Sequence, residues 1–158
     1  MKLSETLIKQ NIIYPLKSKN KSDAIQELLN CLLEQNVLTA TTKLYSFIDE
    51  HDKLMNPAVG RGTAYHYSTS MEIQKPVASF GISINGIDYD SPDKQNVHFI
   101  FLILDSVQDP IEHRKLINRF QHFINDLSVK SQLLTSDSSS SIMDIIINWE
   151  NNLMQDFK

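Results

Sequence analysis

The run from Val97 to Leu104, Val-His-Phe-Ile-Phe-Leu-Ile-Leu, limits the possible folds of this chain more than any other segment. Apart from His98 the run is apolar, without the alternation of a strand that has one face in water. Such continuous runs are typical of a central strand covered on both faces, as in parallel sheets. The sequence therefore predicts a sheet with helices packed on each side.

Four helices are expected around this strand. The first follows apolar residues that repeat at helical spacing from about Ser22 to Leu33. The second is expected after a Thr39 cap, and the third has Asp109 as its cap, Pro110 in the first helical position and Glu112 completing a capping box. The last is expected to start at a Ser141–Asp144 capping signature, after a serine-rich loop. The second helix should face inward with Leu44, Phe47 and Ile48.

Further strands are expected before and after the glycine-containing segment in the first half of the chain. Val77 to Ile84 alternates between apolar and small polar residues, which indicates a strand with one well-buried face. Asn85-Gly86 is a turn signal, and the three residues after it should return as a short hairpin arm. The other expected strands are Asn11 to Pro15 and Thr63 to Tyr67.

Strands that alternate with helices predict an α/β fold, a three-layer sandwich in which a mixed, mostly parallel sheet has helices on both faces. The chain has 158 residues, and we expect residues 1–158 to form a single domain. The net charge of −4 disfavours nucleic acid as the main partner. Cys31 stands alone and falls on the apolar side of a helix, so a buried, unreactive thiol is expected.

No apolar run approaches the ~20 residues of a membrane span, and the start of the chain has no signal-peptide centre. We therefore expect a cytoplasmic protein without a membrane span. The chain has no serine or cysteine nucleophile elbow, no Gly-Lys-Ser/Thr phosphate loop and no dinucleotide fingerprint. No cofactor is predicted. These absences leave histidine chemistry, or binding, as the candidate functions.

The segment Gly60-Arg61-Gly62-Thr63-Ala64-Tyr65-His66-Tyr67 is the main candidate for a functional site. Its two glycines permit backbone conformations and close approaches that side chains forbid, so a ligand can come near the main chain. His113 is expected just past the carboxyl end of the apolar strand, where open α/β sheets place ligand sites. A neutral imidazole can accept a phosphoryl group, a reaction that needs mainly positioning and electrostatic stabilisation.

Each histidine also has an ordinary structural explanation. His66 can simply be a strand residue, and His113 can be tucked under the start of its helix and bonded to a backbone carbonyl. His51 could approach the same region, but the three histidines lack a short ligand spacing, so a metal site is not predicted. His98, in the apolar strand, and His122, on the third helix, are expected to be structural.

In the order of its elements the sequence resembles enzyme IIA of the bacterial phosphoenolpyruvate-dependent phosphotransferase system, in the fructose/mannitol class that includes a nitrogen-regulatory branch. The resemblance runs from Leu3 to about Ile147. That family carries an Arg-Glu pair, then Thr-Gly-Ile-Gly-x-Gly-Ile-Ala-Ile-Pro-His, whose histidine accepts phosphate, and later a second histidine that opens a helix after an apolar strand. The matching residues here are Gly60, Gly62, Ala64, Val97 to Leu104, and His113 ahead of Leu116 and Phe120.

The departures from this pattern fall on the chemistry. His51 and Asp52 occupy the Arg-Glu position, and without a gap Tyr67 replaces the phosphoacceptor while His66 replaces the proline. The stretch from Gly62 to Val77 is about one residue short of the family pattern. If the missing residue is the proline, His66 itself aligns with the phosphoacceptor.

The resemblance therefore implies two alternatives. In one, His66 takes phosphate from a histidine phosphocarrier protein, His113 orients the phosphohistidine, and His51, Gly60, Gly62 and Tyr67 line the site. In the other, the site is degenerate and the domain is a regulatory module that binds a target protein. Tyr67 is a poor substitute acceptor because a phenol with a pKa near ~10 is mostly protonated at neutral pH. A metal or anion site formed by His51, His66 and His113 is a third, weaker alternative.

Overall fold

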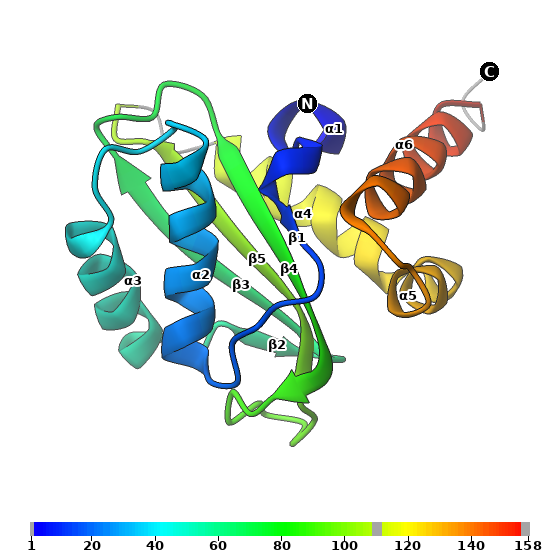
Figure 1. Cartoon of the computed structure of the whole chain (residues 1–158), viewed down its shortest axis with the longest axis horizontal. Helices are drawn as coiled ribbons and strands as arrows, with labels where there is room; N and C mark the ends of the chain where they lie inside the picture. Colours follow the sequence, from blue (N-terminus) through cyan, green and yellow to red (C-terminus); the bar gives the residue numbers. More distant parts are fainter. Residues whose placement is uncertain (1, 109–111, 156–158) are drawn as a thin grey trace.

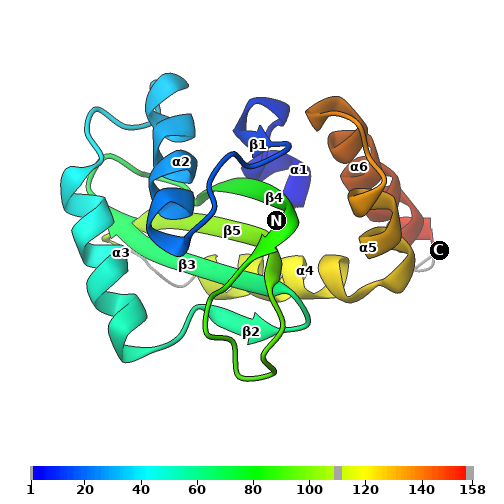
Figure 2. The same cartoon turned by 60° about the horizontal axis from the view of Figure 1, so that its bottom comes forward.

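The structure, a computed structural model, describes residues 2–108 and 112–155. A sheet divides the molecule into layers, with α2 and α3 on one face and α4 on the other (Figures 1 and 2). The α/β sandwich expected from the sequence is confirmed. In chain order the elements are α1 (Leu3–Thr6), the 3₁₀ turn η1 (Lys9–Asn11), β1 (Ile12–Ile13), α2 (Lys21–Glu34), α3 (Thr42–Leu54), β2 (Ala58–Gly60), β3 (Thr63–Ser70), β4 (Val77–Ile87), β5 (Val97–Ser106), α4 (Glu112–Asn125), α5 (Leu127–Leu134) and α6 (Ser139–Gln155).

The sheet has five strands in the order β1-β4-β5-β3-β2. The pairs β1–β4 and β3–β5 are parallel, whereas β4–β5 and β2–β3 are antiparallel, so the sheet is mixed in equal parts. Strand β5 lies in the middle and pairs along most of its length with β4 and β3. This central place explains why its sequence has no polar face.

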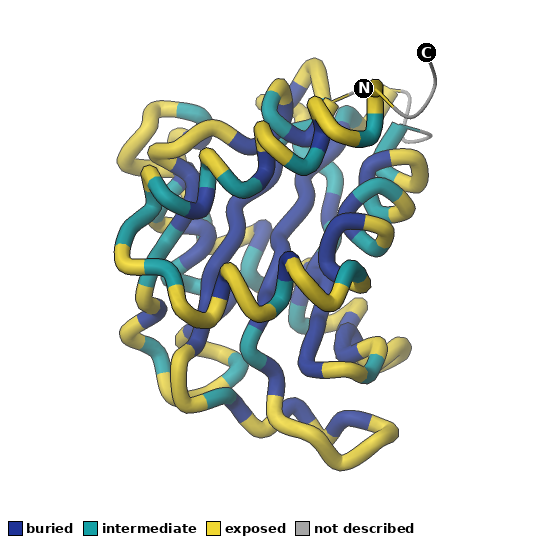
Figure 3. Tube along the Cα trace, turned by 90° about the vertical axis from the view of Figure 1, so that its right-hand side faces the viewer, coloured by how far each residue is buried: buried dark blue, intermediate teal, exposed yellow. Residues whose placement is uncertain are grey.

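The side chains of β5 enter two separate hydrophobic cores. Phe99, Phe101 and Ile103 pack with α1, α4, α5 and α6, whereas Ile100, Leu102 and Leu104 pack with α2 and α3. Figure 3 shows the buried strands between helices that expose only their outer sides. The prediction of a strand covered on both faces is confirmed.

Helix α2 follows its sequence pattern closely. The Asn20 side chain accepts a hydrogen bond from the Asp23 backbone N–H and caps the helix, which satisfies a free donor of the first turn. The Cys31 thiol is half-buried and donates to the Gln10 carbonyl oxygen. Burial, with smaller contributions from the charges of Glu34 and Glu27, raises the pKa of Cys31 to about 11. The thiol therefore stays protonated at neutral pH.

Two helix starts differ from the sequence prediction. Helix α3 has Thr41 in the N-cap position instead of Thr39, whose backbone N–H and hydroxyl donate to Glu72. Helix α6 begins at Ser139, and the Ser138 hydroxyl accepts the Ser141 N–H, so the capping residue lies three positions before the predicted one. In both cases several neighbouring Ser or Thr residues can cap, and tertiary contacts select among them. The predicted cap at Asp109 and Pro110 lies outside the described residues.

The predicted Asn85-Gly86 turn is wrong, because β4 continues through it to Ile87. Gly86 has φ +79° and lies where the register between β4 and β5 shifts. A positive φ suits an irregularity in a strand as well as it suits a hairpin turn, so the dipeptide does not distinguish the two. The inward orientation predicted for Phe47 is also wrong, since its side chain is 55% exposed.

We expect Phe101→Ala to destabilise the fold strongly. The ring is fully buried, stacks on Phe80 at 4.2 Å between centroids and contacts Phe120 at 4.3 Å. Removing a buried phenylalanine leaves a cavity and costs about 3–5 kcal/mol. Urea denaturation measures the loss, and Phe47→Ala on the exposed side of α3 is the control. Similar losses for both variants would contradict the described core.

Candidate functional site

Strand β3 sends His66 and Tyr67 to opposite faces of the sheet. Its parallel pairing with β5 is unbroken from Thr63, opposite Phe99, to Ser70, opposite Ser106. Because no bulge interrupts this pairing, successive side chains alternate between faces. Tyr67 packs toward the α4 side and His66 is buried toward α3. The two residues that compete for the acceptor position therefore occupy different environments.

The His66 imidazole is completely buried and hydrogen-bonded at both nitrogens. Nδ1 lies 2.9 Å from Asp52 Oδ2, and Nε2 lies 2.9 Å from the Tyr89 hydroxyl. Burial, and then the Asp52 charge, raises the pKa of Tyr89, so its phenol keeps its proton. We therefore assign Nδ1–H as the donor to Asp52 and the Tyr89 hydroxyl as the donor to Nε2.

His66 consequently has no free nitrogen in this structure. A phosphoryl acceptor needs an unprotonated nitrogen that its donor can reach, and Nε2 of His66 is buried and bonded to the Tyr89 hydroxyl. Its assignment as phosphoacceptor stays a prediction, and it requires Tyr89 to release the ring.

Tyr67 and His113 meet on the other face of β3, and His51 of α3 approaches Tyr67. The Tyr67 ring stacks on the His113 imidazole with centroids 4.0 Å apart and planes at 18°. His51 approaches Tyr67 edge-on at 6.5 Å between centroids. Burial, and then the charge of Asp105, raises the pKa of Tyr67, although Arg114 opposes this shift. The phenol is therefore even less nucleophilic at neutral pH than a free tyrosine.

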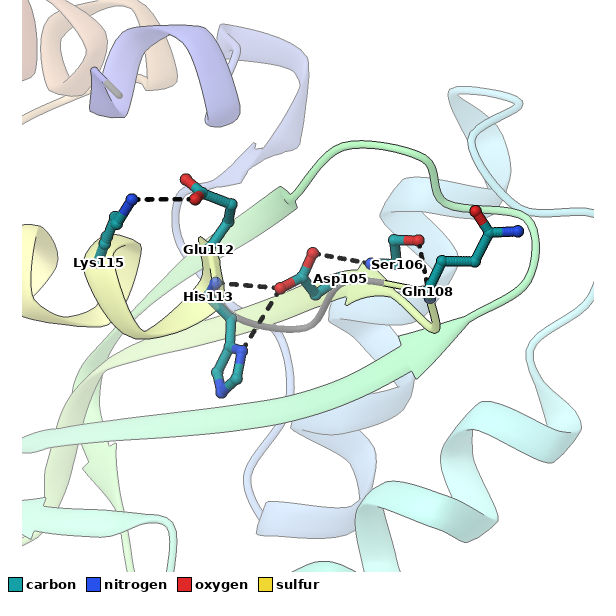
Figure 4. A network of polar contacts seen from close by, with 6 residues as sticks. All are labelled: Asp105, Ser106, Gln108, Glu112, His113 and Lys115. Atoms are coloured by element: carbon teal, nitrogen blue, oxygen red, sulfur yellow. Dashed lines mark hydrogen bonds and ion pairs between the residues drawn. The ribbon is translucent and has the colours of Figure 1, made fainter.

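Asp105 anchors the His113 end of this cluster. It is the ninth residue of β5, it is almost fully buried, and it accepts hydrogen bonds from the backbone N–H groups of Ser106 and His113. Figure 4 shows the His113 ring beside this carboxylate. Nδ1 of His113 lies 3.4 Å from Asp105 Oδ2, which is within ion-pair distance. The two atoms are not placed well enough to form a hydrogen bond.

The two glycines predicted to line the site lie elsewhere. Gly60 and Gly62 have φ values of +90° and +78° and form the turn between β2 and β3, next to Asp93 and Asn96. Tyr67 is five strand residues further along, which corresponds to roughly 17 Å. The glycines therefore serve the turn, and the structure does not bring them to the Tyr67–His113 pair.

The three histidines of the metal alternative do not converge either, because His66 and His113 are on opposite faces of the sheet. In residues 2–108 and 112–155, no group of three or more His, Cys, Asp or Glu side chains could hold a metal ion. Sequence reasoning missed Asp105, although an acidic residue directly after the apolar run from Val97 to Leu104 was a usable signal. It also missed Tyr89, which only the fold brings to His66.

The comparisons with known proteins agree with the fold. The family model for "Phosphoenolpyruvate-dependent sugar phosphotransferase system, EIIA 2" matches residues 5–149. A nitrogen regulatory protein of Bradyrhizobium diazoefficiens is 25% identical over 148 residues, which is 92% of this chain and 95% of that protein. A fructose-specific EIIABC component of Bacillus subtilis is 27% identical over 146 residues, 92% of this chain but only 23% of that protein.

The fold is likewise that of known enzyme IIA proteins. The crystal structure of a nitrogen regulatory protein IIA-Ntr from Neisseria meningitidis superposes with a TM-score of 0.81 at 19% identity, covering 91% of this chain and 98% of that one. The chain thus has the architecture of an enzyme IIA protein. It belongs to the EIIA type 2 family of the phosphoenolpyruvate-dependent sugar phosphotransferase system. No helix in the described ranges is long and apolar enough to cross a membrane.

The buried Asp52–His66 pair makes a prediction about stability. Asp52→Ala leaves the buried Nδ1–H of His66 without an acceptor, and an unsatisfied buried donor costs about 1–3 kcal/mol. Asp49→Ala on the same helix removes an i,i+4 pair with Lys53 and should cost about 0.5 kcal/mol or less, since solvent screens this pair. Urea denaturation compares them. Equal costs would show that the buried contact does not hold α3 on the sheet.

Proposed function

We propose that this protein is an enzyme IIA-like phosphotransfer and regulatory protein, which receives a phosphoryl group on a histidine from a histidine phosphocarrier protein. The observation that carries the proposal is the cluster of Tyr67, His113 and Asp105 near the carboxyl ends of β3 and β5. Ligands of α/β sheets bind at this edge, and the family match places phosphotransfer chemistry on this fold.

The likeness to the nitrogen regulatory protein supports a regulatory role rather than a sugar-specific one. That protein is matched over nearly its whole length, whereas the fructose component is matched over a quarter of its length. On this proposal the protein works in the cytoplasm, takes phosphate from the phosphocarrier and acts on a regulatory target protein.

A second candidate function is a binding module without phosphotransfer. It is favoured by Tyr67, whose phenol stacks on His113 and has a pKa that burial raises. In this alternative the same face would bind the target protein, and the phosphorylation state would play no part.

Incubation with phosphoenolpyruvate, enzyme I and the phosphocarrier distinguishes the two. We expect an acid-labile phosphoryl group on a histidine of the wild-type chain, detected by intact mass before and after acid treatment. A second enzyme IIA protein in the same mixture shows that the donors are active. If only that second protein is labelled, the binding-module alternative is correct.

We also expect Tyr67→His to be labelled faster than the wild type. This substitution puts an imidazole, which is unprotonated near neutral pH, at the half-buried position now held by the phenol. Tyr67→Phe keeps the ring that stacks on His113 but lacks the hydroxyl, and it should be labelled at the wild-type rate. Loss of labelling in Tyr67→Phe would instead make the phenol hydroxyl part of the reaction.

A further inference from the structure

We propose that Nε2 of His113 is the atom that accepts the phosphoryl group, an inference that rests on the function proposed above. In the family pattern the phosphoacceptor is a histidine on β3, where this chain has His66 or Tyr67. His113 would thereby take over the role of that histidine. The argument depends on accessibility, on the orientation of the ring and on the charges around it.

Accessibility separates His113 from the other histidines of the chain. His66 is fully buried, with both nitrogens engaged. The Nδ1 of His98 is bonded to the Ser83 carbonyl, and its ring lies near Gly62 at the other end of β3. His122 is exposed on the last turn of α4, far along the helix from Tyr67. Only His51 and His113 border Tyr67.

Orientation favours His113 over His51. The His113 side chain is 15% exposed, whereas that of His66 is fully buried. Asp105 faces Nδ1, and the other ring nitrogen points away from the carboxylate (Figure 4). A carboxylate beside Nδ1 favours the tautomer with the proton on Nδ1 and leaves the lone pair on Nε2. His51 is exposed and has no carboxylate partner among the contacts described.

The surroundings of His113 suit a transferred phosphoryl group. Arg114 is close enough to lower the pKa of Tyr67 and is exposed, so it supplies a fixed positive charge beside the stacked rings. The negative charge of Glu112 is paired with Lys115 at 3.0 Å, which reduces its repulsion of phosphate (Figure 4). Tyr67 covers one face of the imidazole and restricts its rotation.

The step balances with water as the only further reactant. Nε2 of His113 attacks the phosphorus of the carrier's phosphohistidine, and a new P–N bond forms as the carrier's P–N bond breaks. The carrier imidazole keeps the electron pair of the broken bond and takes up a proton from water. His113 keeps its proton on Nδ1, where the developing positive charge of the ring faces the Asp105 carboxylate.

The test is to label the wild-type chain with phosphoenolpyruvate, enzyme I and phosphocarrier and to locate the phosphoryl group. We expect ³¹P–¹H correlation NMR to show a phosphohistidine substituted at Nε2, and mass spectrometry to place it on the peptide that contains His113. His113→Gln should lose the label. His122→Gln, on the same helix and exposed, should keep the wild-type rate.

The possible outcomes separate this inference from the proposed function. Label on His66 or His51 would overturn the role of His113 while leaving phosphotransfer in place. No label on any histidine, with the donors active, overturns both. Circular dichroism shows whether His113→Gln folds. If it does not, the peptide mapping of the wild-type chain alone decides, because it needs no variant.

Asp105 acts in this proposal as a positioning residue. Asp105→Asn should slow labelling about ten- to a hundredfold, the range of loss seen when a carboxylate that orients a metal-binding imidazole is removed. It should also shift the tautomer of His113 away from the Nδ1–H form, which ¹⁵N chemical shifts of the ring report. Slower labelling with an unchanged tautomer would mean that Asp105 is only structural.

Discussion

The parallel pairing between β3 and β5 is the constraint on which the rest of the site depends. A shift of this pairing by one residue would exchange His66 and Tyr67 between the two faces of the sheet. The pairing is held because β5 is buried on both faces and has no polar side that could turn outward. Which aromatic residue stands next to His113 is therefore decided by packing deep in the sheet, at a distance from any loop.

Much of the fold was predictable from local patterns, and the failures have a common cause. The run from Val97 to Leu104 and the helical spacing in α2 predicted their elements correctly, because burial of apolar side chains determines the conformation of both. The start of α6 and the Asn85-Gly86 segment were mispredicted because several neighbouring residues, or several backbone forms, satisfy the same local rule. In such cases contacts from distant parts of the chain make the choice.

The site was harder to predict than the fold, and for a different physical reason. In a strand, the loss of one residue moves every later side chain to the opposite face of the sheet. Counting along the sequence therefore could not decide whether His66 or Tyr67 occupies the acceptor position. The partners of the two histidines are also far away in sequence or in another element: Tyr89 follows β4, and Asp105 ends the apolar part of β5. No local pattern links either residue to its imidazole.

Helix α3 contributes consecutive side chains to two different layers of the molecule. Asp52 reaches His66 in the core, while His51 stands at the edge of Tyr67 outside it. Because neighbours on a helix are fixed about 100° apart, neither can shift alone. A partner protein that displaces His51 must therefore also strain the buried contact between Asp52 and His66. The buried carboxylate–imidazole pair therefore also fixes the position of His51 beside Tyr67.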